Sequence, residues 1–428
     1  MPTTKQTDGN PRVDASLRQR LAECRSTTTA LVEGLNEADV TVQSMDDASP
    51  AKWHLAHTTW FFEEFVLGPW LAGWQPVDPG YRFLFNSYYD TVGERHPRPR
   101  RGLLTRPALA EVLDYRARVD DGLDRLFGQR ELPEGVPGLL ELGIAHEQQH
   151  QELLLTDILH LFAQNPLKPA WRHPDPSARP RPRAVAGPAR WIEQPGGCFE
   201  VGHDGDGFAF DCETPHHRVL LAPYALASRP VNNREWLEFI DDGGYSTPTL
   251  WLSDGWRQVQ EAGWNAPLYW AQRDGEWRQM TLLGELPLDL DAPVSHVSYF
   301  EADAFARWRG ARLPTEFEWE VAAAGRPMVG NFASSGRLRP LPPDGDRASL
   351  QQLYGDVWEW TASAYAAYPG FRTAAGAVGE YNGKFMCGQF VLRGGSCATP
   401  AGHLRPSYRN FFYPHQRWQF CGLRLARA

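Results

Sequence analysis

The sequence predicts an α+β protein of two domains, in which a four-helix bundle precedes a domain of short strands and helices. Three observations lead to this prediction: amphipathic helical segments fill the first part of the chain, a proline-rich stretch follows, and the chain then changes to short segments separated by Gly, Pro and Asp. A chain of 428 residues can form two domains that each bury a core. We place the bundle at 12–165, the linker at 166–188 and the second domain at 189–428.

Three helices are expected before residue 128. Apolar residues recur at helical spacing over Val13–Leu35. Ser49 is suited to cap a second helix, AKWHLAHTTWFFEEFVL, with Pro50 at its first position. A third amphipathic segment covers 105–127, and the long connection 68–102 separates it from the second. With the fourth helix described next, these segments favour a four-helix bundle.

The fourth helix, Leu139–Leu161, contains a pair of histidines that could bind a metal. His146 and His150 are four residues apart, so both imidazoles lie on one face of the helix and can coordinate one divalent transition metal. Such a pair also arises by chance or on a surface. The string HEQQH fits the HExxH pattern of zinc proteases, but a protease needs a third ligand downstream. Thr156 occupies the position of the downstream histidine, and the proline-rich stretch that follows this helix has no Glu before Glu193, which argues against a protease.

A third histidine must therefore come from upstream. His57 lies on the apolar stripe of the second helix, between Trp53 and Trp60. A lone histidine in that setting is commonly a core residue, but a bundle can direct it at the pair on the facing helix. His54 competes for the role but faces another way. Three neutral imidazoles would leave coordination positions open for exogenous ligands, unlike a closed structural zinc site.

The long connection holds further polar candidates. It contains the string NSYYD, with Tyr88 and Tyr89, and then the basic string RHPRPRRG. Its prolines predict an extended segment from which Arg98 and Arg101 project toward one region, which suits a substrate that bears a carboxylate. An exposed basic loop explains the same composition equally well.

Composition restricts the classes of function. The net charge of −9 offers no electrostatic case for nucleic acid, and no apolar run approaches a membrane span. The first residues, MPTTKQTDGNPRVD, lack the apolar segment of a secretory signal, and the six cysteines are scattered without a CxxC pair. We expect a cytoplasmic monomer or small homo-oligomer that acts on small molecules.

The second half is expected to be an irregular α+β domain. Its segments are short, rich in aromatic residues and separated by turns. Thr315 is suited to cap a helix. The strands predicted are Trp191–Val201, His217–Ala227 and Val391–Gly394, and the helices are Arg229–Ile240, Tyr299–Trp308 and Pro314–Ala324.

Several motifs resemble known families. PGGCFEVGHDG, RPVNNREWLEFI, PVSHVSYFEADAFARWRGARLPTEFEWEVAAAG, YGDVWEWTAS and VLRGGSC are similar to the formylglycine-generating-enzyme (sulfatase-modifying) domain, which has a C-type-lectin-like fold. PAKWHLAHTTWFFEEF and AHEQQHQELLLTDILH resemble the DinB-like metal bundle. Their fusion resembles the hercynine oxygenases, the sulfoxide synthases of ergothioneine biosynthesis, from about residue 15 to the C-terminus.

That resemblance implies a reaction and a set of roles. A non-haem iron(II) would be held by three histidines, and O2 would couple the sulfur of cysteine or γ-glutamylcysteine to hercynine as a sulfoxide. The adjacent tyrosines resemble the family branch that uses free cysteine, and one of them would donate a proton or hydrogen atom. The site would lie between the two domains. The matching positions are His57, His146 and His150 for iron, Tyr88 and Tyr89 for catalysis, Arg98 and Arg101 for substrate carboxylate, Gln149 beside iron, and Asn410, Phe411 and Phe412 for hercynine.

Some positions depart from the parent patterns. Asn410-Phe411-Phe412 stands where the mycobacterial pattern has Asn-Trp-Asp, which bears on hercynine binding. Cys397 follows the GGS string without a close second cysteine, so the copper chemistry of the parent domain is not expected. The segment Asp356–Glu359 resembles a calcium-binding segment of some relatives and would add a structural calcium ion.

Other functions fit the same residues. Histidine could replace hercynine as the acceptor, as in ovothiol-pathway synthases, although those usually carry a methyltransferase domain. A zinc-dependent thiol transferase would use the same bundle. A different class is a lectin-like binding protein whose bundle holds structural zinc, since three imidazoles bind zinc as readily as iron(II).

Overall fold

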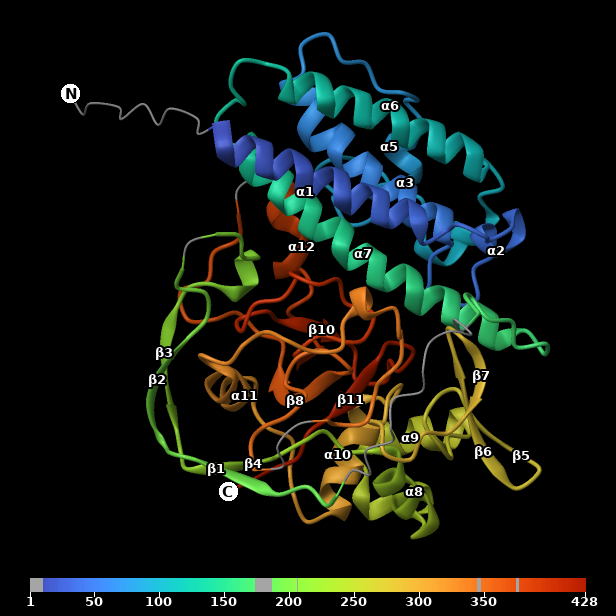
Figure 1. The fold of residues 1–428 in the computed structure, drawn as a ribbon, viewed down its shortest axis with the longest axis vertical. Helices are drawn as coiled ribbons and strands as arrows, with labels where there is room; N and C mark the ends of the chain where they lie inside the picture. The colour runs from blue at the N-terminus through green and yellow to red at the C-terminus, as the bar shows by residue number, and fades with distance from the viewer. Residues whose placement is uncertain (1–10, 174–186, 206, 345–347, 375–376) are drawn as a thin grey trace. The chain divides into compact units, whose positions relative to one another are not determined.

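The structure is a computed structural model that describes residues 11–173, 187–205, 207–344, 348–374 and 377–428. The chain forms two compact units that divide after Leu161, as the colours of Figure 1 allow the reader to follow. Most of the predicted linker lies outside the described residues, and the predicted domain boundaries stay predictions.

The first unit is helical. Short helical elements lie between the first three of its four long helices, and the longest helix runs three residues past the division between the units. The elements are α1 (Pro11–Ala30), α2 (Glu37–Thr41), α3 (Ala51–Phe62), a π-helical turn (Glu63–Leu67), α4 (Gly68–Trp70), α5 (Tyr81–Leu84), a 3₁₀ helix (Arg98–Leu103), α6 (Leu109–Phe127) and α7 (Val136–Gln164).

Contacts between the long helices close them into the predicted bundle. Gln151 of α7 donates to the carbonyl of Cys24 in α1, and Arg18 of α1 pairs with Asp124 of α6. Tyr115 of α6 donates to the Glu63 carboxylate directly after α3. His54 of α3 in turn contacts Asp157 of α7, so each long helix contacts two others, and the bundle prediction is confirmed.

Two local predictions in this unit are wrong. Pro50, not Ser49, is the N-cap of α3, and it offers no side-chain hydrogen bond. The Ser49 backbone N–H donates instead to Asp157 on α7, 2.8 Å away. The basic segment expected to be extended is the 3₁₀ helix Arg98–Leu103, because proline is tolerated in the first turn of a helix. With three residues per turn, this helix still places Arg98 and Arg101 on one side.

The second unit consists of small sheets and short helices. The sheets have the strand orders β1-β4-β12, β10-β9-β8-β11, β2-β3 and β5-β6-β7, and β11 pairs with β8 in parallel. The strands are β1 (Trp191–Gln194), β2 (Gly197–Val201), β3 (His217–Leu221), β4 (Tyr224–Ala227), β5 (Trp270–Arg273), β6 (Glu276–Thr281), β7 (Gly284–Pro287), β8 (Trp358–Ala364), β9 (Phe390–Arg393), β10 (Asn410–Phe412), β11 (Cys421–Leu423) and β12 (Ala426–Arg427). The helices are α8 (Asn233–Asp241), α9 (Ser253–Ala262), α10 (Tyr299–Trp308), α11 (Glu316–Ala323) and α12 (Glu380–Gly383).

In this unit the predicted helices agree with the structure more closely than the predicted strands do. Thr315 caps α11 by accepting from the Glu318 backbone N–H, as expected. Each of the two long predicted strands is instead a pair of strands in different sheets. The breaks fall at Pro195-Gly196 and at Pro223, because proline cannot donate to a strand ladder.

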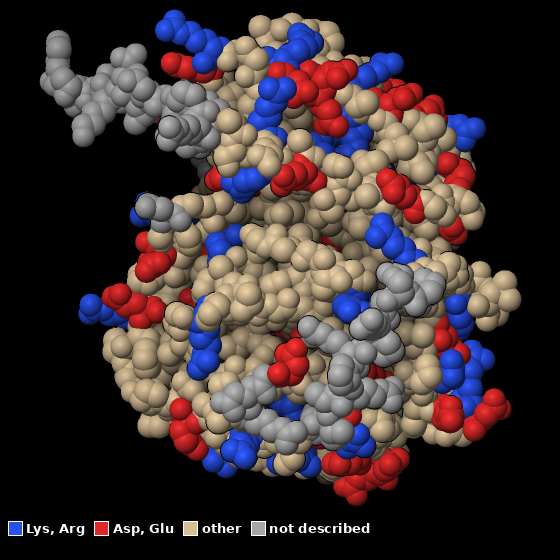
Figure 2. Space-filling model, in the orientation of Figure 1, with Lys and Arg blue, Asp and Glu red and all other residues tan. Residues whose placement is uncertain are grey.

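Charge is mixed on the surface. Figure 2 shows basic and acidic side chains interspersed over the coloured surface of each unit on the face that it draws. Among the described residues, none of the helices combines the length and apolar character that crossing a bilayer requires.

The contact between α3 and α7 depends on Gly143. A Cβ atom added there would lie 2.4 Å from Cε1 of Phe62 and 3.1 Å from Cε1 of Phe61. Both phenylalanines are fully buried. We expect Gly143→Ala to lower the free energy of unfolding by about 1–3 kcal/mol through overpacking.

Gly138→Ala on the same helix is the matched control, because a Cβ there meets no atom within 4 Å. It is expected to raise stability by about 0.5 kcal/mol through helix propensity. Urea unfolding followed by circular dichroism at 222 nm measures both variants. Equal effects of the two substitutions would contradict this packing.

Candidate metal centre

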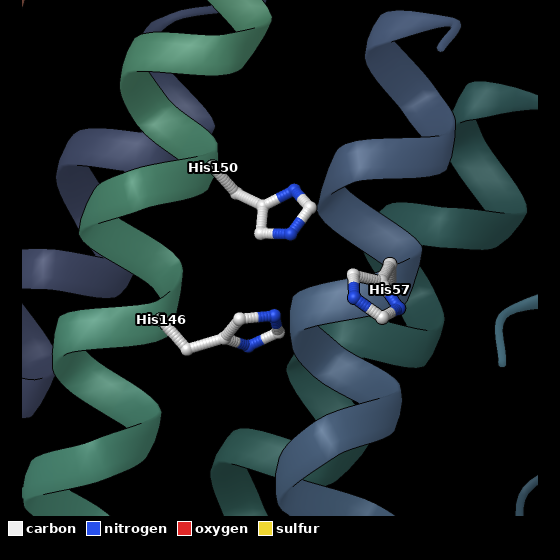
Figure 3. Close-up of side chains that lie close together, drawn as sticks. All are labelled: His57, His146 and His150. Atoms are coloured by element: carbon white, nitrogen blue, oxygen red, sulfur yellow. The ribbon is translucent and has the colours of Figure 1, made fainter. Parts of the chain in front are cut away.

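Three histidines converge inside the bundle. His57 of α3 faces His146 and His150 of α7, and ring nitrogens of the three lie within 4.8 Å of one another (Figure 3). Their exposed fractions are 1%, 5% and 8%. Among the described His, Cys, Asp and Glu side chains, these three form the group whose spacing suits one metal ion.

Burial keeps these imidazoles neutral. It lowers the pKa of His57 and of His150 well below the usual value, and the neighbouring His146 lowers both further. Burial also lowers the pKa of His146 to about 4. Each ring therefore has a nitrogen lone pair at neutral pH, which is the form that binds metal.

The His57 ring is held in one orientation. Its Nδ1 lies 2.6 Å from the carbonyl oxygen of Phe85, so Nδ1 carries the proton and Nε2 keeps the lone pair. Trp53 stacks on the ring at 4.6 Å between centroids, and Trp60 stacks at 5.7 Å. The neighbouring histidine, His54, is not part of the group and contacts His150 instead.

This donor set fits a divalent transition metal. Three neutral, buried imidazoles suit iron(II) and zinc alike, and three protein ligands leave further coordination positions for exogenous ligands. The predicted metal ligands are therefore brought together by the structure.

Glu147, the acidic residue of the HExxH pattern, points away from this group. Its side chain is fully buried and forms ion pairs with Arg25 and Arg116. Burial alone would raise the pKa of Glu147, but Arg116 and Arg25 lower it overall. Because both arginines hold its carboxylate in the bundle interior, Glu147 does not serve here as the general base that the same residue provides in HExxH proteases.

Arg101 is a buried cation beside the histidines. It is 2% exposed, and its guanidinium lies 3.4 Å from the centroid of the Trp53 ring. It donates to the hydroxyls of Ser49 and Ser87, while no carboxylate among the described residues pairs with it. Burial, and then Arg98, lowers the pKa of Arg101 to about 9, so it remains charged at neutral pH. Such a cation favours a bound anion.

The two tyrosines differ in their surroundings. Tyr88 is half-buried, and the guanidinium of Arg98 lies 5.7 Å from its ring centroid. Tyr89 is 4% exposed and packs against Trp60, with 5.7 Å between ring centroids. Because Trp60 also stacks on His57, the Trp60 ring separates Tyr89 from His57.

The other predicted residues lie on separate elements. Gln149 is half-buried on α7, next to His150. Asn410, Phe411 and Phe412 form β10 of the second unit, where Phe411 stacks on Tyr365 at 4.0 Å between centroids. A site shared by the two domains stays a prediction.

The segment considered for calcium already has protein partners. Asp356 accepts from the side chains of Asn331 and Gln352 and from the backbone of Leu341. Glu359 is fully buried in an ion pair with Arg424. A calcium ion would have to displace these partners.

Sequence reasoning missed the partners of the site residues. Asp157, which contacts His54, could have been found, because it lies seven residues after His150 and so on the same helix face. Ser87 and the arginine partners of Glu147 come from distant segments, and spacing alone does not indicate them.

Comparisons with known proteins agree with this architecture. The model of the DinB superfamily matches residues 20–154. The model of the sulfatase-modifying factor enzyme 1-like domain matches residues 176–344 and 331–428. The predicted fold class, a DinB-like bundle followed by a sulfatase-modifying domain, is confirmed.

Relatives cover nearly the whole chain. The chain is 36% identical to hercynine oxygenase of Mycolicibacterium smegmatis, over 96% of this chain and 98% of that protein. It is 37% identical to hercynine oxygenase of Mycobacterium tuberculosis, over 95% of this chain and 97% of that protein. It is also 30% identical to ergothioneine biosynthesis protein 1 of Schizosaccharomyces pombe, over 51% of this chain and 28% of that protein. The resemblance inferred from the motifs is confirmed.

The ion pairs of Glu147 predict a structural rather than a chemical role. Glu147→Gln leaves two buried arginines without their shared carboxylate, and we expect it to lower the free energy of unfolding by about 3–5 kcal/mol. Arg18→Ala breaks an exposed pair with Asp124 and should cost less than about 1 kcal/mol. Loss of helical circular dichroism in urea measures both, and similar losses would show that Glu147 is not the buried anchor.

Proposed function

The chain belongs to the family of the hercynine oxygenases of ergothioneine biosynthesis, and we propose that it forms a C–S bond between hercynine and L-cysteine. The proposed cofactor is iron(II) and the co-substrate is O2. A ring C–H of hercynine and the S–H of cysteine are replaced by a C–S bond, one oxygen atom becomes the sulfoxide, and the other leaves as water. The four electrons that O2 accepts come from forming the C–S bond and from oxidising the sulfur.

The observation that carries this proposal is the group of buried, neutral histidines. His57, His146 and His150 would hold the iron, which would supply redox chemistry and open positions for exogenous ligands. Because none of the three carries charge, the full positive charge of the ion is available to attract a thiolate. A protein carboxylate in the set would weaken that attraction.

Arg101 and Arg98 are proposed to bind substrate carboxylate. Arg101 lies on the Trp53 face, and Trp53 stacks on His57, so a carboxylate held there lies close to the metal ligands. The guanidinium still lacks a carboxylate partner within the described structure. A zwitterionic amino acid would supply one.

The Tyr88–Tyr89 pair is proposed to supply a proton or hydrogen atom during C–S bond formation. Tyr88 is half-buried beside Arg98, where a bound carboxylate would lie, whereas Tyr89 is packed among Trp60 and Phe65. This difference favours Tyr88 as the donor and Tyr89 as a packing residue.

The second unit is proposed to help bind the trimethylammonium group of hercynine. Phe411 of β10 stacks on Tyr365, and its ring centroid lies 5.8 Å from that of Phe385, which gives an aromatic surface suited to cation–π contact.

We place the reaction in the cytoplasm, where the six cysteines, which form no disulfide, stay reduced. γ-Glutamylcysteine as the thiol and histidine as the acceptor are the alternatives within the same chemistry.

Anaerobic loading with iron(II), followed by air, cysteine and hercynine, tests the proposal. We expect a hercynine–cysteine sulfoxide by mass spectrometry, with γ-glutamylcysteine and histidine run in parallel as competing substrates. His57→Ala and His146→Ala should lower the rate at least about 100-fold, because a metal with two ligands is held weakly.

His160→Phe is the matched control, because it removes an α7 imidazole that bonds to Ser44 instead of joining the group. It should keep the activity of the unaltered protein. Cystine or cysteine sulfinate alone, with no coupled product from any pair, would refute the synthase. Tightly bound zinc in such an inactive protein would favour the lectin-like binding protein.

A further inference from the structure

We infer that His54 and Asp157 form a positioning dyad that holds His150, one of the three histidines of the metal centre. The inference rests on the metal site of the proposed function. It concerns side chains that the metal itself does not touch, and it assigns them the task of fixing which nitrogen of His150 is free to bind.

The dyad is a continuous chain of buried contacts. Nδ1 of His54 lies 2.8 Å from Nδ1 of His150, and Nε2 of His54 lies 3.1 Å from Oδ2 of Asp157. The exposed fractions are 2% for His54, 7% for Asp157 and 8% for His150. Water therefore competes little for these hydrogen bonds.

The partners dictate where each proton sits. The Asp157 carboxylate only accepts, and its Oδ2 also accepts from the Ser49 backbone N–H at 2.8 Å. Nε2 of His54 must therefore donate to it, which leaves Nδ1 of a neutral His54 as an acceptor. Nδ1 of His150 then donates to His54, and the lone pair of His150 is on Nε2.

The opposite arrangement would disable the site. If His54 donated through Nδ1, Nδ1 of His150 would have to accept, and its Nε2 would carry the proton. A protonated Nε2 cannot bind a metal. The dyad thus does for His150 what the carbonyl of Phe85 does for His57, while Nδ1 of His146 has no hydrogen-bond partner among the described residues.

The same contacts also join the two helices that carry the ligands. Asp157 is on α7, two turns after His150, and it binds both His54 on α3 and the residue that precedes the N-cap of α3. A sliding or rotation of α3 against α7 would break these bonds. The dyad therefore links the orientation of the His150 ring to the position of α3 along α7.

Two variants and one matched control test the inference. His54→Phe keeps an aromatic ring and removes both nitrogens. Asp157→Asn keeps the shape but lets its amide donate to Nε2 of His54, which permits the opposite protonation of His150. His160→Phe removes an α7 imidazole outside the dyad.

The readouts do not depend on catalysis. In the metal-free protein, ¹⁵N spectra of labelled histidine should show His150 protonated on Nδ1, and this protonation should be lost or mixed in Asp157→Asn. Affinity for cobalt(II), measured by competition with a chelator, should fall about 10- to 100-fold in both dyad variants and stay unchanged in the control.

Several outcomes would overturn the inference. One is the finding that His150 carries its proton on Nε2 in the unaltered protein. This measurement does not depend on whether any variant folds. Another is a cobalt(II) affinity within about twofold of the unaltered protein in a folded His54→Phe variant. Loss of one nitrogen from the cobalt(II) coordination shell in that variant would make His54 a ligand instead. If the dyad variants behave as expected but no sulfoxide forms, the proposed reaction fails and the positioning role stands.

Discussion

The buried charge cluster of Glu147 fixes the rotation of α7, and the rest of the first unit depends on that rotation. A fully buried carboxylate is tolerated only where counter-charges meet it, and here Arg25 of α1 and Arg116 of α6 do so. The helix period then directs His146 and His150 to a different face, toward α3. The acidic residue of this HExxH string therefore serves packing, while its two histidines join the group whose spacing suits a metal ion.

The elements around α3 complete this face. His57 is stacked between Trp53 and Trp60, and the same Trp53 ring carries the guanidinium of Arg101 on its face. A candidate metal ligand, an aromatic ring and a buried cation thus contact one another in succession on one side of the helix. This arrangement suits the proposed chemistry, in which a thiol and a carboxylate belong to the same small substrate.

Sequence reasoning succeeded where the signal is local and periodic. The spacing of His146 and His150, the apolar stripe that carries His57 and the cap at Thr315 follow from the helix period and from local hydrogen bonds. It failed where a single proline changes the outcome. Proline split the strand predicted at Trp191–Val201, and proline began a 3₁₀ helix where an extended segment was expected. Partners such as Asp157 and Ser87 depend on tertiary packing, which spacing indicates only weakly.

The central claim is that the metal binds His57, His146 and His150, with Glu147 and His54 outside its coordination shell. A crystal structure of the iron(II)-loaded protein, with anomalous diffraction recorded at the iron edge, tests it most directly. We expect one anomalous peak bonded to a nitrogen of each of the three histidines, with the Arg25–Glu147–Arg116 cluster intact. A peak bonded to Glu147 or His54, or one located elsewhere in the chain, would contradict it.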